Sequence, residues 1–147
     1  MLLLKLNMLL FSFLFTGFTA FAQTGFYSFG EEAGALSGKA VGPFGKVIIG
    51  KVRNNQAQFF LYVCNGAPAN HTGTVMGTLK IVNNKAVYKQ AHSDKYCQYA
   101  FLFDKGGVSV SQGGTSSDCG LGQNVTADGY YKRTSSAVPT EKDLQGE

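Results

Sequence analysis

Hydrophobic and polar residues alternate along much of the chain, in short runs separated by glycine, asparagine and aspartate. Residues 46–53 and 56–64 form the clearest pair of runs. Asn54-Asn55 between them is typical of a two-residue hairpin turn, because asparagine tolerates the left-handed conformation. The same turn chemistry recurs at Asn83-Asn84. Alternation with regular turn residues predicts β-strands, and patterns typical of helices are nearly absent after residue 23.

The pattern predicts about eight short strands, joined mostly by hairpins. They are expected within residues 26–29, 36–41, 46–53, 56–64, 74–82, 85–90, 97–103, 108–112 and 125–133. This spacing favours an all-β fold, a small antiparallel β-barrel or sandwich. In the run 108–112, Val108 and Val110 are expected to face the core, whereas Ser109 and Ser111 face the other way.

Two strands carry more specific expectations. Gly25-Phe26-Tyr27 begins the first strand, which either closes the barrel or forms a plain edge strand, and the edge strand is the favoured interpretation. Residues 56–64 are apolar almost throughout, which indicates burial on both sides near the end of that strand.

The N-terminus has a different pattern. Lys5 precedes an uncharged run from Met8 to Phe21, and Ala20 and Ala22 provide the small residues that a signal peptidase needs. The alternative is an uncleaved anchor, but a membrane span needs about 20 apolar residues. We therefore predict a signal peptide over 1–22, a β domain over 23–134 and a flexible tail over 135–147. The product is expected in the periplasm or medium, without membrane insertion after cleavage.

The charge of the exported chain is mildly basic. Without Lys5, 12 basic and 9 acidic residues remain, a formal net charge of +3. The basic residues are scattered rather than gathered in the dense stripe of a nucleic-acid binder. Their excess favours acidic partners, and nucleic acid is not expected among them.

Three cysteines allow three disulfide pairings in an oxidising compartment. The strand pattern favours Cys97–Cys119, because a hairpin brings the residue after its second strand back beside the start of its first. Cys64 then remains as a thiol at the end of a strand, and it is expected to be a small buried hydrophobic residue.

The sequence contains no motif that indicates catalysis, a cofactor or a metal site. His92-Ser93-Asp94 contains the residue types of a nucleophilic site, but adjacent residues in an extended loop point apart. No close cysteine pair or His-x3-His spacing indicates zinc. We therefore expect a protein that is not an enzyme and that needs no cofactor.

Two segments stand out as candidate surfaces for a partner. One is Ser37-Gly38-Lys39, and the other is the run 130–136, which joins two tyrosines to two cations. Tyrosine offers contact area at low entropic cost, and arginine pairs well with carboxylates. The candidate partner-binding residues are Ser37, Lys39, Tyr131, Lys132 and Arg133. The alternative is that one of the tyrosines packs inward while the cations are merely solvated.

The stretch from Gly73 to Arg133 resembles a group of small bacterial exported β domains of unassigned function. The resemblance rests on these segments: Lys85-Ala86-Val87-Tyr88, Asp118-Cys119-Gly120-Leu121-Gly122 and Ala127-Asp128-Gly129-Tyr130-Tyr131-Lys132-Arg133. Some of these domains are similar to periplasmic lysozyme inhibitors, in which a serine and a cation enter the lysozyme cleft. Ser37-Gly38 matches the start of their Ser-Gly-x-x-Tyr motif, but Val41 stands where the tyrosine belongs. The Ala22-Gln23 junction is similar to those of exported proteins of Bacteroidetes-type bacteria.

These observations lead to three hypotheses. The first is an exported, non-enzymatic binding module with a protein partner in the envelope or extracellular space, such as a lysozyme or another cell-wall hydrolase. The second is a lipocalin-like carrier of a small apolar ligand, since a barrel of about eight strands can just hold one. The third is a hydrolase that uses His92.

Overall fold

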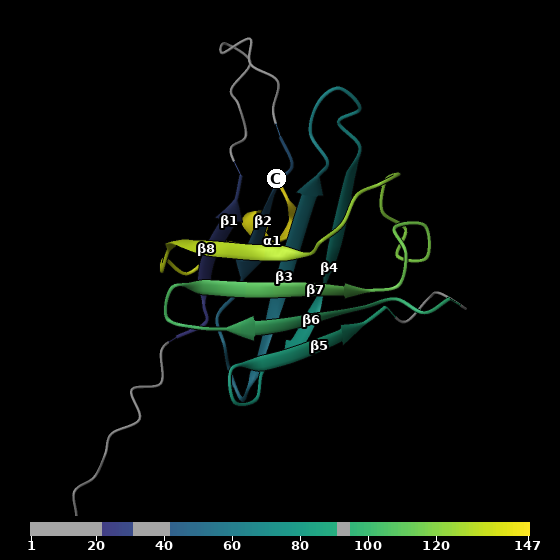
Figure 1. The fold of residues 1–147 in the computed structure, drawn as a ribbon. Coiled ribbons are helices and arrows are strands. Elements are labelled where there is room, and N and C mark those ends of the chain that lie inside the picture. The colour runs from purple at the N-terminus through teal and green to yellow at the C-terminus, as the bar shows by residue number, and fades with distance from the viewer. Residues whose placement is uncertain (1–21, 31–41, 91–94) are drawn as a thin grey trace, which may run out of the picture.

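The computed structural model describes residues 22–30, 42–90 and 95–147, which form an antiparallel, nearly closed barrel-like sheet (Figure 1). The elements are β1 (Gly25–Phe29), β2 (Phe44–Ile49), β3 (Gln56–Cys64), β4 (Thr72–Lys80), β5 (Lys85–Lys89), β6 (Gln98–Phe103), β7 (Gly107–Gly113), β8 (Gly129–Ser135) and the short helix α1 (Glu141–Gln145). The predicted all-β barrel is confirmed. The expected strand at 36–41 and the predicted signal peptide up to residue 21 lie outside the described residues.

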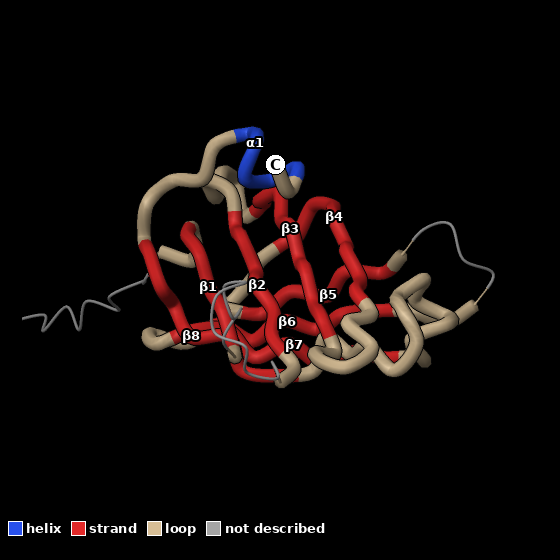
Figure 2. The backbone as a smooth tube through the Cα atoms, turned by 90° about the horizontal axis from the view of Figure 1, so that it is seen from above, coloured by secondary structure: helices blue, strands red, loops and turns tan. Residues whose placement is uncertain are grey.

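The strands follow the order β4-β3-β2-β1-β8-β7-β6-β5, so the first and last strands of the chain are neighbours in the middle of the sheet. β1 pairs with β2 over its whole length and also with β8, so the interpretation of β1 as a plain edge strand is wrong. Strands β5–β8 lie in front of β1–β4 in Figure 1 and run across them, and Figure 2 shows the two halves from above. The free edges of the sheet belong to β4 and β5.

The asparagine turns have the predicted left-handed backbone. The φ angles are 49° and 60° at Asn54 and Asn55, and 50° and 61° at Asn83 and Asn84. Both turns are tight, because this conformation matches the right-handed twist of the flanking strands. The first joins the paired strands β2 and β3, whereas the second joins β4 to β5 through the single bridge between Val82 and Lys85.

The protein's own side chains fill the interior of the barrel. The ring of Phe59 on β3 lies 5.3 Å from that of Phe101 on β6 and 5.0 Å from that of Tyr88 on β5, measured between centroids. These edge-on contacts join the two halves of the barrel. The largest buried side chains also include Tyr27, Tyr99, Tyr131, Ile49, Leu61, Leu79, Val47, Val63, Val108 and Val125.

A side chain bridges the seam between the free edges of β4 and β5. The Tyr88 hydroxyl donates a hydrogen bond of 3.1 Å to the carbonyl oxygen of Met76. A methyl group at Gly77 would lie 2.8 Å from Cζ and 2.9 Å from Oη of Tyr88, so the ring takes the place of a side chain there. The absence of a side chain at Gly77 therefore lets β5 reach β4 through Tyr88.

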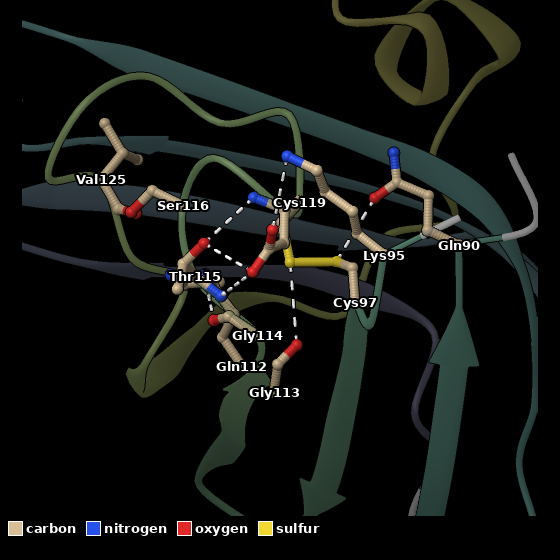
Figure 3. Close-up of a disulfide and its surroundings, with 12 residues drawn as sticks. Gln90, Lys95, Cys97, Gln112, Gly113, Gly114, Thr115, Ser116, Cys119 and Val125 are labelled. Carbon is tan, nitrogen blue, oxygen red and sulfur yellow. Dashed lines mark hydrogen bonds and ion pairs between the residues drawn. A yellow bond between two sulfur atoms is a disulfide. The ribbon is translucent and has the colours of Figure 1, made fainter. Parts of the chain in front are cut away.

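A disulfide-bonded loop covers the other end of the seam (Figure 3). Cys97 and Cys119 are joined with their Cα atoms 5.1 Å apart, which confirms the favoured pairing. In the same loop, the amide of Gly122 donates to the carbonyl oxygen of Thr72 at 3.0 Å. The disulfide thus ties the residue before β6 to a loop that is hydrogen-bonded to the start of β4. Cys64 is buried and unpaired, as expected.

The C-terminal segment differs from the predicted flexible tail. Thr140 and Asp143 form a capping box that begins α1, and α1 contacts β2 and β3. Leu144 packs against Gly50, and Gly146 lies against the ring of Phe60, an outward-facing residue that is only 4% exposed. The helix escaped prediction because a single turn with one apolar residue facing the barrel produces no apolar period.

Tyr99 and Tyr131 offer a matched test of the core. Both side chains are fully buried, but the Tyr131 hydroxyl donates to the carbonyl oxygen of Ala127 at 3.0 Å, whereas that of Tyr99 has no hydrogen-bond partner among the described residues. Burial raises the pKa of Tyr99 to about 12. We expect Tyr131→Phe to cost about 1 kcal/mol of unfolding free energy, because it leaves a buried carbonyl unpaired. Tyr99→Phe should be neutral or stabilising, and urea titration of both variants provides the comparison.

Candidate functional site

Tyr130 and Tyr131 are neighbours on β8, but their side chains face opposite sides of the sheet. Tyr131 faces the interior and is 0% exposed, so its assignment to a partner-binding surface is wrong. Tyr130 faces outward and is 47% exposed, and Lys132 is exposed on the same side of β8. One part of the alternative is confirmed, since one of the two tyrosines packs inward.

Arg133 lies on the opposite side of β8 from Lys132. Its guanidinium donates to the hydroxyl of Tyr27 at 2.6 Å and to the carbonyl oxygen of Ala22, and it lies 5.1 Å from the centroid of the Tyr27 ring. Arg133 is therefore turned toward Tyr27 on β1, and the structure does not bring it together with Lys132 on one surface. Its contact with Ala22 belongs to the chain before cleavage, because Ala22 ends the predicted signal peptide. Ser37 and Lys39 lie outside the described residues.

Two contacts fix the Tyr130 ring, a hydrogen bond at its hydroxyl group and the packing of the ring against Gly107. Its hydroxyl donates to Oδ1 of Asp104 at 2.9 Å, and the amides of Gly106 and Gly107 donate to the same oxygen at 2.7 and 2.8 Å. A methyl group at Gly107 would lie 2.8 Å from both Cζ and Oη of the ring. The Tyr130 hydrogen bond is the main cause of the lowered pKa of Asp104. An exposed aromatic ring is therefore held in one place before any partner binds.

A second exposed tyrosine, Tyr96, lies over the last residue of β7, the strand next to β8. Tyr96 precedes β6 and is 64% exposed. A methyl group at Gly113 would lie 3.1 Å from Cε1 and 3.1 Å from Oη of Tyr96, so this ring also takes the place of a side chain on β7. The disulfide at the next residue, Cys97, fixes the backbone beside it (Figure 3).

The two rings belong to one outward face of β6, β7 and β8. The pairing register places Leu102, Ser109 and Tyr130 in one row, and Ala100 beside Ser111 in the next. Leu102 is 50% exposed. We call this surface the two-tyrosine face, and it consists of Tyr96, Ala100, Leu102, Ser109, Ser111 and Tyr130.

Lysines border the two-tyrosine face. The register places Lys85 beside Leu102, Lys89 beside Gln98 and Lys132 beside Gly107. All three are exposed, and none makes an ion pair with another residue of the described ranges. The three lysines give this border an excess of positive charge that favours an acidic partner, and the Asp104 carboxylate beside Tyr130 offsets part of it.

The sequence missed Tyr96 and Leu102 as parts of this face. Tyr96 ends a polar connection, and its place over β7 depends on contacts between residues distant in sequence. The alternation around Ser109 and Ser111 did contain a clue, because it places Gly107 and Gly113 on the outward side, where each leaves room for a ring.

Three grooves lined by described residues lie outside the barrel. Two grooves of about 230 and 640 Å³ run beside α1 and share Gln58, Thr78, Glu141 and Leu144 among their lining residues. The third, of about 550 Å³, lies in the disulfide-bonded loop and is lined by Thr115–Ser117, Gly120, Leu121, Gln123 and Asn124. Apart from the tyrosine hydroxyls, no polar or charged side chain is buried within the described ranges.

The candidate catalytic and metal-binding residues form no recognisable site within the described part of the chain. His92-Ser93-Asp94 lies outside the described residues, and Nδ1 of His71 contacts the carbonyl oxygen of Gln123 at 3.0 Å. Within residues 22–30, 42–90 and 95–147, no three His, Cys, Asp or Glu side chains gather where they could hold a metal. In the same ranges, no helix has the length and hydropathy to cross a membrane.

Comparison of the chain with protein-family models, curated proteins and solved structures yields no significant match. A function for this chain must therefore be argued from the surface chemistry of the barrel, since a fold alone does not specify one.

The exposed aspartates predict the response of the fold to acid. Hydrogen bonds from neighbouring hydroxyls lower the pKa values of Asp104, Asp118 and Asp143. A lowered folded-state pKa stabilises the protein above the unfolded value of about 3.9, and this contribution is lost as the pH falls through the folded value. We expect the melting temperature to fall between about pH 4 and pH 2. The triple Asp→Asn variant should show a smaller fall, and an identical fall in both proteins would contradict this assignment.

Proposed function

We propose that this protein is an exported, non-enzymatic binding module that contacts its partner through the two-tyrosine face. The observation that carries the proposal is the fixation of Tyr130 by Asp104 and Gly107. A preorganised, exposed aromatic ring loses little conformational entropy on binding, and tyrosines are enriched among residues that dominate binding energy. The disulfide is consistent with a site of action in the periplasm or medium.

The filled interior argues against the carrier hypothesis. A lipocalin-like carrier needs space between its strands, whereas Phe59, Phe101 and Tyr131 occupy the interior here. Binding is therefore assigned to the outer surface.

The lysozyme-inhibitor version of the proposal is a narrower one. It expects a hydroxyl and cations to converge on two carboxylates in the cleft of the hydrolase. Of the expected residues that are described, Lys132 is the cation exposed on the two-tyrosine side, while Arg133 is turned toward Tyr27. Titration of lysozymes with the purified protein tests this version, and unchanged muramidase activity at nanomolar to micromolar protein would remove it.

The two-tyrosine face itself can be tested by capture from the host's own envelope extract and culture fluid. We expect Tyr130→Ala to lose most of the captured material, because truncation of an aromatic residue that anchors an interface costs about 2 kcal/mol or more. Met76→Ala, which truncates a 51% exposed side chain on β4, is the matched control and should capture as well as the unaltered protein. Equal capture by both variants would place the binding surface elsewhere.

A further inference from the structure

The two exposed tyrosines lie over the first and the last residue of the same strand. Tyr130 covers Gly107 and Tyr96 covers Gly113, and these glycines begin and end β7. Six steps along a strand at about 3.3 Å each place the two rings roughly 20 Å apart. The surface between them is long and narrow, and it has an aromatic ring at each end.

Two serines lie along the middle of this surface, and the half-exposed side chain of Leu102 lies beside one of them, Ser109. Ser109 and Ser111 face outward from β7 between the two rings, and Ala100 lies beside Ser111 on β6. Hydroxyl groups between two aromatic rings offer hydrogen bonds at the centre of the face and apolar contact at its ends.

We infer that the two-tyrosine face binds a linear acidic polysaccharide, an inference that rests on the proposed function and names its ligand class. A pyranose ring presents a face of C–H groups, which the negatively charged face of an aromatic ring attracts. The hydroxyls and ring oxygens of the sugars between can exchange hydrogen bonds with Ser109 and Ser111. Both tyrosine rings are already held against glycines, so little side-chain entropy is lost when the chain binds.

The lysines that border the two-tyrosine face favour an acidic polysaccharide over a neutral one. Lys85 and Lys89 on β5 and Lys132 on β8 lie on opposite sides of β6 and β7. Carboxylates of a polysaccharide lying along β7 would pass within reach of the two lysines of β5 on one side and of Lys132 on the other. The same lysines would repel each other if a second copy of this chain occupied the face.

Affinity electrophoresis in gels that contain polygalacturonate, alginate or hyaluronate tests the inference. We expect at least one of these linear acidic polysaccharides to retard the purified protein more than neutral galactan does. Tyr96→Ala and Tyr130→Ala should each weaken binding about fivefold or more, which corresponds to about 1 kcal/mol for one aromatic contact. Lys85→Gln combined with Lys89→Gln should weaken binding and flatten its dependence on salt.

Four controls separate the ring contact from charge and from folding. Met76→Ala should bind as the unaltered protein does. Tyr130→Phe should bind better than Tyr130→Ala because it keeps the ring, and less well than the unaltered protein because it loses the hydrogen bond to Asp104. Polyglutamate supplies carboxylates without sugar rings, and its binding should be weaker and insensitive to Tyr130→Ala. Thermal melts identify any variant that is not folded.

Several outcomes would overturn the inference. They are failure of all three acidic polysaccharides to bind, or equal binding of polyglutamate with no effect of the tyrosine variants. If Tyr130→Ala still abolishes capture of an envelope protein, the ligand class is wrong but the proposed function stands. If no tyrosine variant changes any binding, both fail.

Discussion

Phe59→Ala should destabilise the protein by about 3–5 kcal/mol, because it removes the ring that joins the two halves of the barrel. Phe59 is 1% exposed and contacts both Phe101 and Tyr88. Its loss also removes the packing that holds Tyr88 across the seam, so the cavity should be accompanied by faster hydrogen exchange along β4 and β5. Chemical denaturation and amide exchange measure the two effects.

The same variant also tests whether the barrel is filled. A fluorescent apolar probe should bind Phe59→Ala better than the unaltered protein, because the substitution opens a cavity in the interior. Met76→Ala truncates an exposed side chain and should change stability by less than about 0.5 kcal/mol. A cost below about 1 kcal/mol for Phe59→Ala would mean that the interior is not packed as described.

Replacing both Cys97 and Cys119 by serine should lower the free energy of unfolding by about 3 kcal/mol, the amount that the chain-entropy model assigns to a closed loop of about 20 residues. The effect should be concentrated at the seam. The loop beyond Cys119 is hydrogen-bonded to Thr72 through Gly122, so without the disulfide the amide of Gly122 should exchange much faster.

Reducing agent is the control for this prediction. It should lower the denaturation midpoint of the unaltered protein toward that of the double variant and leave the double variant unchanged. A midpoint that is insensitive to reduction in the unaltered protein, with the disulfide shown to be broken, would contradict a stabilising role for the Cys97–Cys119 bond.

Local sequence chemistry predicted the parts of the fold that are themselves local. Asn54-Asn55 and Asn83-Asn84 are found in left-handed turns, and Val108 and Val110 face the core. The Cys97–Cys119 pairing followed because a hairpin alone brings the two residues together.

The remaining features depend on contacts between distant parts of the chain. Pairing of β1 with β8 joins residues more than 100 positions apart, for example Tyr27 and Arg133, and no local pattern specifies it. Tyr130 and Tyr131 are chemically identical neighbours, so alternation requires one to face inward but does not say which. The sequence therefore indicated only part of the two-tyrosine face, because it pointed to Lys132 but not to Tyr96 or Leu102.

The central claim is that this barrel binds with the outer face of β6, β7 and β8 and not with its interior or the grooves beside α1. The most direct measurement is a series of ¹⁵N–¹H amide spectra recorded while polygalacturonate oligomers, or the material captured from the host, are added. We predict that the largest shifts occur at Tyr96, Ser109, Ser111 and Tyr130, with Phe59 and Leu144 unaffected. Shifts centred on Leu144 or on the interior residues, with Tyr130 unchanged, would contradict the account.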